Sequence, residues 1–377
     1  TIPEQLRFKK RTVREVVEEV AEIPVDEQPE VETVTPRPIR RGDAHRIRST
    51  LTYRDGDGDV ELGLVTPVED RLVPMGECPA LTGSTRRLIS HVEGALEATP
   101  DPPPAFRRAA ENGGEARPGI AHIGVATPTF GRGLVDLAFD GLDEDGFVEM
   151  LHAETTEAFV DALLERLPED VGLSAHRGEV REEIKPPNRI TLPLLDLKIV
   201  AGYDDWFPAT LRPTEVLYET ALAALELGSS DRFLDVGCGV GTLSILAGPH
   251  VDSATGIDIN RHSIEAAELN AIQNDVDNVE FMPSGWEKAL RQLALGGRSY
   301  TAATINPMRS PLGERPLTYL GELGVERLVY LGPSAESAAK DIGVLVAKGW
   351  SLEQLGAANI HPATYHTMLV AKLARTG

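Results

Sequence analysis

The sequence predicts an α/β protein in which a doubly wound carboxyl-terminal domain follows a smaller α+β domain. From about residue 200, short apolar runs alternate with amphipathic helical segments, which is typical of parallel strands covered by helices on both faces. Between about 45 and 75, strand-like segments flank DGDGD, which indicates a hairpin turn. We therefore expect an N-terminal helix and acidic linker over 1–40, a central α+β domain over 41–200 and a doubly wound domain over 201–377.

Local patterns predict the elements of the first part. Apolar residues near helical spacing predict a helix over 4–22, and proline-rich, acidic residues over 24–38 predict a linker because proline interrupts a helix. After the hairpin we expect a helix over 84–97, a Pro/Gly-rich loop over 99–118, and short strands over 120–195 with a helix near 155–166.

Strands and helices alternate regularly in the remaining chain. The predicted helices cover 212–226, 241–248, 261–273, 286–294, 315–323 and 335–347. The predicted strands cover 233–237, 254–258, 279–282, 300–305, 326–331, 350–358 and 366–373. This order predicts a sheet that binds its ligand at the carboxyl ends of the strands.

The strongest motif lies where the first of these strands meets its helix. In FLDVGCGVGTLSIL, residues 233–246, the strand carries Asp235, and Gly237, Gly239 and Gly241 open the helix. Glycines permit a sharp turn and a close approach of backbone to ligand. Asp258 ends the next strand, where a carboxylate can accept hydrogen bonds from ribose hydroxyls. No Gly-Lys-Ser/Thr follows, which excludes a P-loop.

The GxGxG form after an acid resembles motif I of the class I S-adenosylmethionine (SAM) methyltransferases. Other segments resemble the uracil-5 RNA methyltransferases, which make 5-methyluridine in tRNA or rRNA, and they keep that family's order along nearly all of the chain. They are EQLRFKKRTVREVV (4–17), ECPAL (77–81), 256–281, INPMRS (305–310), 330–342 and HPATYH (361–366). The resemblance implies a class I methyltransferase domain over 201–377 that binds SAM through Asp235, Gly237, Gly239, Gly241, Asp258 and Asn306.

Two departures concern that family's chemistry. Its Cys thiolate attacks carbon 6 of uracil, so that carbon 5 becomes nucleophilic towards the SAM methyl group, and a carboxylate then helps to remove the carbon 5 proton. Pro333 stands where the resemblance places the nucleophile, and Met368 stands where it places the glutamate. Neither side chain can perform these steps, and Ser334 would need an adjacent base. The catalytic residues therefore stay unassigned.

Two further comparisons bear on the cofactor and the acceptor. The family's SAM-contacting Gln has no counterpart in WFPATLRP (206–213), which implies weakened SAM binding. Asn306-Pro307-Met308 also resembles the Asn-Pro-Pro-aromatic motif of amino-group methyltransferases. Met308 and Arg309 supply no aromatic ring, which disfavours that variant, although an oxygen of Asn306 can still face a target.

Basic residues gather in one segment, at Arg37, Arg40, Arg41, His45, Arg46 and Arg48. Arg46 and Arg48 match a family segment that faces RNA, and with Arg309 they are the substrate-binding residues that the resemblance implies. A solvated arm that offsets the acidic linker explains the same charges equally well.

The sequence predicts no metal site. Cys78 matches one ligand of an iron–sulfur cluster found in some family members, but the other three would precede Thr1, and one thiolate cannot hold a cluster. The family's RNA-binding β-barrel would also precede Thr1, and truncation and loss of that part both remain open. His361 and His366 lack further zinc ligands nearby in the sequence.

The charge balance limits the choice of partner. The 377 residues include 59 Asp and Glu against 37 Lys and Arg, a net charge of −22, which excludes a uniformly basic RNA-binding surface. Only eight of the basic residues are lysines, which is typical of proteins in a salty cytoplasm and also of GC-rich genomes. Two cysteines and the lack of a long apolar run or signal-peptide core predict a cytoplasmic protein without a membrane span.

Three functions fit these patterns. The first is a SAM-dependent methyltransferase that acts on RNA, such as tRNA or rRNA, by direct transfer. The second is a catalytically inactive RNA- or protein-binding descendant of the family that retains SAM. The third is a small-molecule methyltransferase, which no motif supports. No pattern names the target atom, a protein partner or the oligomeric state.

Overall fold

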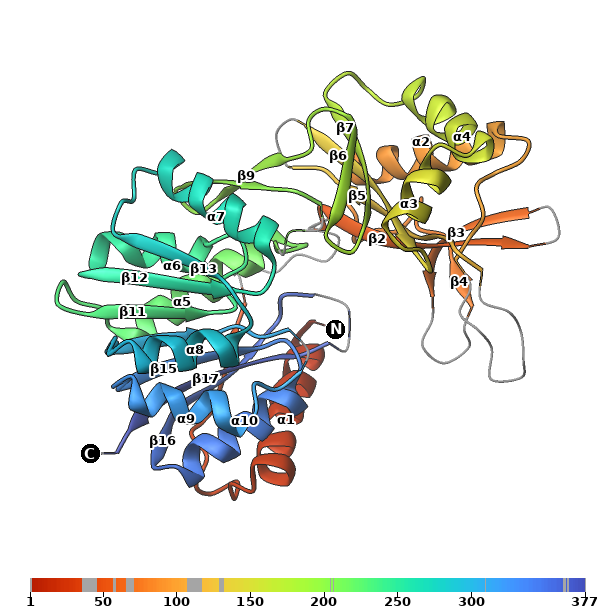
Figure 1. Ribbon diagram of the computed structural model, residues 1–377. Helices are drawn as coiled ribbons and strands as arrows, with labels where there is room; N and C mark the ends of the chain where they lie inside the picture. Colours follow the sequence, from red (N-terminus) through yellow and green to blue (C-terminus); the bar gives the residue numbers. More distant parts are fainter. Residues whose placement is uncertain are drawn as a thin grey trace. The chain divides into compact units, whose positions relative to one another are not determined.

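The chain forms two compact units, which are described separately (Figure 1). The computed structural model describes residues 2–35, 46–56, 59–65, 71–106, 117–128, 132–203, 205, 207–308, 310–361, 364 and 366–376. Unit 1 comprises residues 1–41, 193–200 and 205–377, and unit 2 comprises residues 42–192 and 201–204. The sequence places a separate N-terminal region over 1–40, whereas the structure groups these residues with the carboxyl-terminal domain.

Unit 1 is built on an eight-stranded sheet in the order β1-β16-β17-β15-β14-β11-β12-β13. Its strands are β1 (Val31–Val34), β11 (Arg232–Val236), β12 (Ser253–Asp258), β13 (Val279–Pro283), β14 (Ala302–Ile305), β15 (Arg327–Gly332), β16 (Trp350–Ala358) and β17 (Met368–Arg375). The pairs from β13 to β15 are parallel, and β17 is antiparallel to both of its neighbours. This arrangement matches the doubly wound sheet that the sequence predicts.

Helices cover both faces of this sheet (Figure 1). One face carries α8 (Trp286–Leu295), α9 (Glu314–Glu322), α10 (Ala335–Ala347) and α1 (Ile2–Ala21), whose apolar side chains form one core with the strands. The other face carries α5 (Leu211–Leu225), α6 (Thr242–Ala247), continued by the 3-10 turn η1 (Gly248–His250), and α7 (Arg261–Gln273). Parallel strands need both faces buried, which explains their nearly continuous apolar runs.

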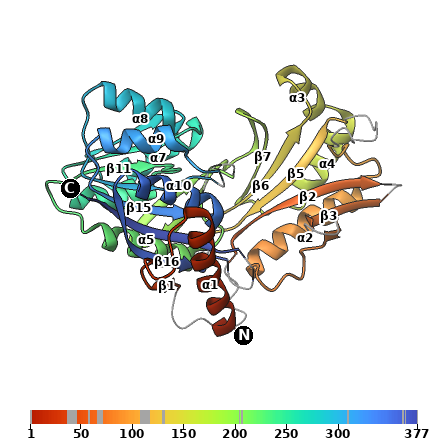
Figure 2. The same ribbon diagram turned by 90° about the horizontal axis from the view of Figure 1, so that it is seen from below.

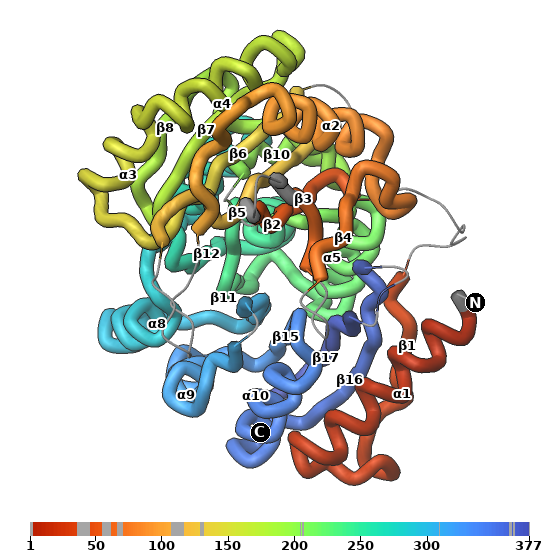
Figure 3. The backbone as a smooth tube through the Cα atoms, turned by 90° about the vertical axis from the view of Figure 1, so that its right-hand side faces the viewer, coloured from red at the N-terminus to blue at the C-terminus, as the bar shows by residue number. Residues whose placement is uncertain are grey.

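The N-terminal segment differs from the linker that the sequence predicts over 24–38. β1 lies within it and pairs in parallel with β16, from Val31 opposite Leu355 to Val34 opposite Ala358 (Figure 3). Both valines are buried, whereas Glu32 between them is exposed. α1 packs against α10 (Figure 2) and so brings β1 to the sheet edge, a long-range effect that the local proline and acid content does not reveal.

Unit 2 is the α+β domain that the sequence predicts. Its sheet has the order β4-β3-β2-β5-β6-β7-β8, in which only the β6–β7 pair is parallel. Its strands are β2 (Arg48–Gly56), β3 (Asp59–Val65), β4 (Leu72–Val73), β5 (Gly119–Ala126), β6 (Gly133–Asp140), β7 (Val171–Arg177) and β8 (Val180–Lys185). The helices are α2 (Gly83–Ala98), α3 (Glu144–Leu151) and α4 (Glu154–Leu164). α4 is the helix that the sequence predicts near 155–166, whereas α3, just before it, is not predicted.

A short hairpin, β9 (Ile190–Leu194) and β10 (Leu197–Ala201), completes the described elements. Within the described ranges, none of the helices has the length and apolar content needed to cross a bilayer.

Candidate functional site

The predicted cofactor loop lies at the point of unit 1 where the strand order reverses. From β11 the chain proceeds to β12 and β13 on one side, and β14 and β15 lie on the other side. The connections that leave the carboxyl ends of β11 and β14 therefore run in opposite directions along the sheet. Open α/β sheets bind ligands at such a point. Gly237 follows β11 and Asn306 follows β14, so the topology brings together these two predicted residues.

Contacts between the two strand ends require the glycine at position 237. The Asn306 amide donates to the Val236 carbonyl at 2.8 Å, and a Cβ on Gly237 would lie 2.3 Å from the Asn306 carbonyl oxygen. Gly237 also has a φ of +82°, which favours glycine. The glycine motif therefore indicates a close approach between the backbones at Gly237 and Asn306 as well as a turn.

The rest of the glycine loop is fixed to β12. The amides of Gly237 and Cys238 both donate to the Ile257 carbonyl, at 2.8 and 3.0 Å. Gly239 and Gly241 have φ values of +53° and +82°. The loop therefore enters α6 with a defined backbone that only glycines adopt without strain.

Asp258 connects the end of β12 with the glycine loop. Its Oδ2 accepts a hydrogen bond from the Gly239 amide at 2.9 Å, and its Oδ1 accepts one from the Asn260 amide at 2.9 Å. Burial raises the pKa of this carboxyl, an effect that the backbone donors partly offset. Each carboxylate oxygen has a second lone pair, so Asp258 can also accept from a ribose hydroxyl.

Ile259 is a candidate cofactor-binding residue that the motifs do not identify. It follows Asp258 directly, its side chain is 72% exposed, and its Cδ1 lies 3.8 Å from where a Cβ on Gly285 would be. A large exposed apolar side chain beside a carboxylate that can accept from a ribose hydroxyl provides a surface for a planar base. In the sequence, Ile259 is marked only by its position, as an apolar residue between the polar residues Asp258 and Asn260 that precede α7. The carboxylate, the glycine loop and this apolar surface together fit the SAM that the sequence predicts.

Asp235 occupies a different environment from Asp258. The residue is 0% exposed, and its two oxygens accept hydrogen bonds from Ser244 in α6 at 2.9 Å and Thr304 in β14 at 2.8 Å. Burial raises the pKa of this carboxyl to about 6. The sequence predicts a direct cofactor contact, whereas this geometry makes Asp235 an internal connection that holds α6 and β14 beside the glycine loop.

The positions of the family's nucleophile and base hold groups with structural roles. Pro333 directly follows β15, and the Ser334 hydroxyl caps α10 by accepting a hydrogen bond from the Ser337 amide at 3.3 Å. Met368 begins β17 and is buried. That covalent attack on uracil lacks a nucleophile here stays a prediction from the sequence.

The predicted RNA-binding arginines that the structure describes, Arg46 and Arg48, lie in unit 2. The Arg46 Nε donates to the Arg48 carbonyl at 3.1 Å, and burial lowers the pKa of Arg46. The Arg48 guanidinium lies 4.5 Å from the ring centroid of Tyr203, a cation–π contact. Both arginines thus stabilise their own unit, and RNA contact by them stays a prediction. Arg309, the third predicted residue, lies outside the described residues.

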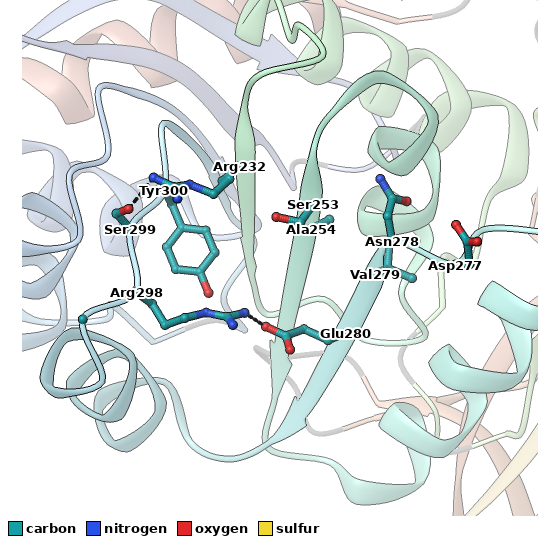
Figure 4. A pocket seen from close by; sticks show the side chains of 11 residues that line it. Arg232, Ser253, Ala254, Asp277, Asn278, Val279, Glu280, Arg298, Ser299 and Tyr300 are labelled. Atoms are coloured by element: carbon teal, nitrogen blue, oxygen red, sulfur yellow. Dashed lines mark hydrogen bonds and ion pairs between the residues drawn. The ribbon is translucent and has the colours of Figure 1, made fainter.

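A pocket of about 420 Å³ lies at the opposite, amino-terminal edge of the unit 1 sheet (Figure 4). Arg232, Glu280, Arg298 and Tyr300 are among its lining residues. Glu280 forms an ion pair with Arg298 and accepts a hydrogen bond from Thr255 at 2.9 Å, so charges in the wall are paired with one another. Distance from the glycine loop excludes this pocket as the predicted cofactor site. Among the described residues, no group of three or more His, Cys, Asp and Glu side chains is arranged to hold a metal ion.

Comparisons with known proteins agree with this fold and site. A family profile described as "Methyltransferase domain" matches residues 227–305, which include the glycine loop and Asp258. An "uncharacterized RNA methyltransferase" of Enterococcus faecalis is 24% identical over 340 residues, which cover 88% of this chain and 71% of that protein. One of Streptococcus pyogenes is 24% identical over 383 residues, covering 99% and 80%. In one of Clostridium tetani the identity is 29%, but the match spans only 44% of this chain and 36% of that protein.

A solved structure confirms the predicted fold class. The Pyrococcus abyssi tRNA (uracil-54, C5)-methyltransferase, solved in complex with S-adenosyl-L-homocysteine, superimposes with a TM-score of 0.69. The match covers 99% of this chain and 84% of that protein at 20% sequence identity. The chain therefore has a class I methyltransferase fold together with a central α+β domain, and its sequence resembles the RNA methyltransferases.

Proposed function

We propose that this chain, a class I methyltransferase fold that resembles the RNA methyltransferases, binds SAM at the carboxyl ends of β11, β12 and β14 and methylates RNA by direct transfer. The observation that carries the proposal is the bond from the Gly239 amide to Asp258 Oδ2 at 2.9 Å. It fixes the glycine loop to the strand end whose carboxylate suits a ribose, and Ile259 adds an exposed apolar surface beside it.

Some residues of the site bind the cofactor, and another faces the methyl acceptor. Gly237, Gly239 and Gly241 let the backbone approach the cofactor, and Asp258 orients its ribose. Asn306 lies at the end of β14, next to Gly237, and we assign it to the acceptor side of the cofactor. When bound, SAM would supply an electrophilic methyl group: the bond from sulfur to the methyl carbon would break as the bond to the acceptor atom formed, S-adenosylhomocysteine would leave, and the proton of the acceptor would pass to solvent. Positioning, rather than covalent activation of the acceptor, provides the catalysis.

A substitution of Asp258 tests the cofactor site. Asp258→Asn replaces one acceptor oxygen by a donor and removes the charge, so it should weaken SAM binding by about tenfold or more, as expected for loss of hydrogen bonds to a charged group. Titration calorimetry with SAM measures the Kd. Asp277→Asn makes the same charge change at the opposite edge of the sheet, among residues that line the other pocket, and should leave the Kd unchanged. Equal affinities of all three proteins would contradict the assignment.

Methyl transfer itself is tested with tritium-labelled SAM and unmodified tRNA transcripts or rRNA fragments. The proposal predicts label in RNA. It also predicts no stable covalent adduct with RNA that contains 5-fluorouridine, because Pro333 has no nucleophilic atom. Transfer with such an adduct would contradict direct transfer, and the nucleophile would then have to be sought elsewhere.

A non-catalytic RNA- or protein-binding descendant is the second candidate. The observations that favour it are Ser334, whose hydroxyl caps α10, and Met368, which is buried at the start of β17. SAM binding without transfer to any RNA fraction would support this candidate over the methyltransferase. Absence of SAM binding would exclude both the methyltransferase and a cofactor-stabilised descendant.

A further inference from the structure

The loop over 306–313 connects β14 with α9 and begins on the acceptor side of the proposed site. Its first residue is fixed by the Asn306 amide, which donates to the Val236 carbonyl at 2.8 Å. Met308, two residues later, is 70% exposed, whereas Leu312 near the end of the loop is buried. The position of the exposed Met308 therefore depends on how firmly both ends of the loop are held.

A carboxylate from a distant part of the chain holds the other end. Asp341 Oδ2 accepts a hydrogen bond from the Leu312 amide at 2.7 Å, and Oδ1 accepts one from the Gly313 amide at 3.1 Å. Gly313 is the N-cap of α9, and it provides no side chain to cap the helix. Asp341 extends from α10 and accepts from the N-cap amide and the amide before it, and its negative charge interacts favourably with the amino-terminal end of the α9 dipole.

Tyr330, in β15, provides the third hydrogen bond to Asp341. Its hydroxyl donates to Asp341 Oδ2 at 2.6 Å, and both residues are almost fully buried, with Asp341 1% exposed. Burial, together with the neighbouring Asp341, raises the pKa of Tyr330, so the phenol keeps its proton and remains a donor. A buried carboxylate is costly without hydrogen bonds, and three of them, at 2.6, 2.7 and 3.1 Å, fix the position of Asp341.

We propose that Asp341 and Tyr330 are positioning residues that hold the 306–313 loop in the form that receives the methyl acceptor. The proposal rests on the proposed function, because the loop faces an acceptor only if the chain transfers a methyl group. Neither residue belongs to the glycine loop or to Asp258. The pair should therefore affect transfer and leave the affinity for SAM nearly unchanged.

Two substitutions of different severity test the pair. Tyr330→Phe removes one hydrogen bond and keeps the ring in the core, whereas Asp341→Asn replaces one acceptor oxygen by a donor that faces a backbone N–H group. Asp231→Asn is the matched control, since Asp231 is also a buried carboxylate. It accepts from the Gly228 amide, Thr301 and Arg327 at 2.6 to 2.8 Å, at the opposite edge of the same sheet.

The kinetic readout is the kcat and KM of transfer to an RNA transcript, together with the SAM Kd from calorimetry. We expect Asp341→Asn to lower kcat at least tenfold and Tyr330→Phe to lower it several-fold, with the SAM Kd within twofold of the wild-type value. Asp231→Asn should change neither quantity. An equal loss of kcat in Asp231→Asn and Asp341→Asn, or a parallel loss of SAM affinity, would overturn the positioning role.

Hydrogen exchange keeps the inference testable if the wild-type protein transfers no methyl group to RNA, a result that would refute the proposed function alone. The peptide that contains the Leu312 and Gly313 amides should exchange at least tenfold faster in Asp341→Asn and measurably faster in Tyr330→Phe. It should exchange at the wild-type rate in Asp231→Asn. Unchanged exchange of this peptide in Tyr330→Phe and Asp341→Asn would show that the pair does not hold the loop.

Discussion

Asp235 and Asp258 are two carboxylates with different roles, although the sequence gives both the same prediction. Asp235 belongs to the strand that precedes the glycine loop and Asp258 ends the parallel strand that follows it, and neither position reveals its burial. Ser244 and Thr304 saturate Asp235 inside the fold, whereas backbone amides orient Asp258 at the strand end. The loop could be located from the sequence because its three glycines lie at alternate positions within five residues, but the separation of these roles depends on Thr304, which is distant in the chain.

The buried state of Asp235 leads to a prediction about pH. Burial raises its pKa to about 6 from an ordinary value of 3.8. The folded protein therefore holds this proton more tightly, and Asp235 contributes stability below pH 3.8 that is lost as the pH rises through about 6. Relative to wild type, Asp235→Asn should gain about 2 kcal/mol in free energy of unfolding between pH 4 and pH 7. Urea denaturation of both proteins over this range measures the difference.

Asp231 provides the control of opposite sign. Burial raises the pKa of Asp231, but hydrogen bonds from Thr301, Gly228 and Arg327 outweigh that effect and lower it below its ordinary value. Its contribution is present above pH 3.8 and lost as the pH falls, so Asp231→Asn should lose stability relative to wild type as the pH rises. The same pH trend for both variants would contradict the assigned environments.

At the scale of elements, α1 holds the segment that joins β16 to β17. Lys9 is 0% exposed, and its Nζ donates to the Asn359 side-chain oxygen at 2.8 Å and to the carbonyls of His361 and His366 at 3.3 and 2.5 Å. Gln5 donates to the Thr364 carbonyl at 2.9 Å in the same way. The helix therefore orders a distant connection in unit 1 by inserting a cation among its carbonyl groups.

Lys9→Met should lower the free energy of unfolding by about 2 kcal/mol near neutral pH, since it leaves buried oxygens without their charged donor. Burial lowers the pKa of Lys9 from 10.5 to about 8, so the unfolded chain binds this proton more tightly. Wild-type stability should therefore rise relative to Lys9→Met as the pH increases from about 8 to 10.5. Denaturant titrations at pH 7.5 and 10 measure this change. A constant difference would contradict the burial of a charged Lys9.

Elements with strong local periodicity could be predicted from the sequence, and elements that depend on distant partners could not. The helices over 261–273 and 335–347 and the strand over 350–358 have the predicted bounds. β1 is four residues long, and its pairing with β16 stabilises it from more than 300 positions away. α3 is short and begins at the Asp143 cap, so its two buried residues, Phe147 and Leu151, give little periodic signal. Asp341 was missed for the same reason as β1, because its partners Leu312 and Gly313 belong to another segment.

For the whole molecule, the net charge of −22 has two consequences that can be separated by experiment. An acidic chain repels RNA phosphates, so any RNA association must depend on local basic patches and on non-ionic contacts. The same excess of like charge destabilises the compact state through self-repulsion. A cytoplasmic location and adaptation to high salt stay predictions from composition.

Salt should therefore stabilise this protein, because screening reduces the repulsion among its excess acidic groups. Raising KCl from 0.1 to 1 M shortens the screening length from about 10 to 3 Å. It also weakens exposed ion pairs such as Arg11–Glu15, but each such pair contributes little to stability. The excess of 22 negative charges should outweigh that loss, so Tm should rise by several degrees, most of it below 0.5 M, where screening changes fastest.

Scanning calorimetry in KCl measures Tm, and a parallel series in sucrose controls for effects that act through exclusion from the protein surface rather than through charge. A Tm that falls between 0.1 and 0.5 M KCl would show that ion pairs, and not net repulsion, dominate the electrostatics of this fold.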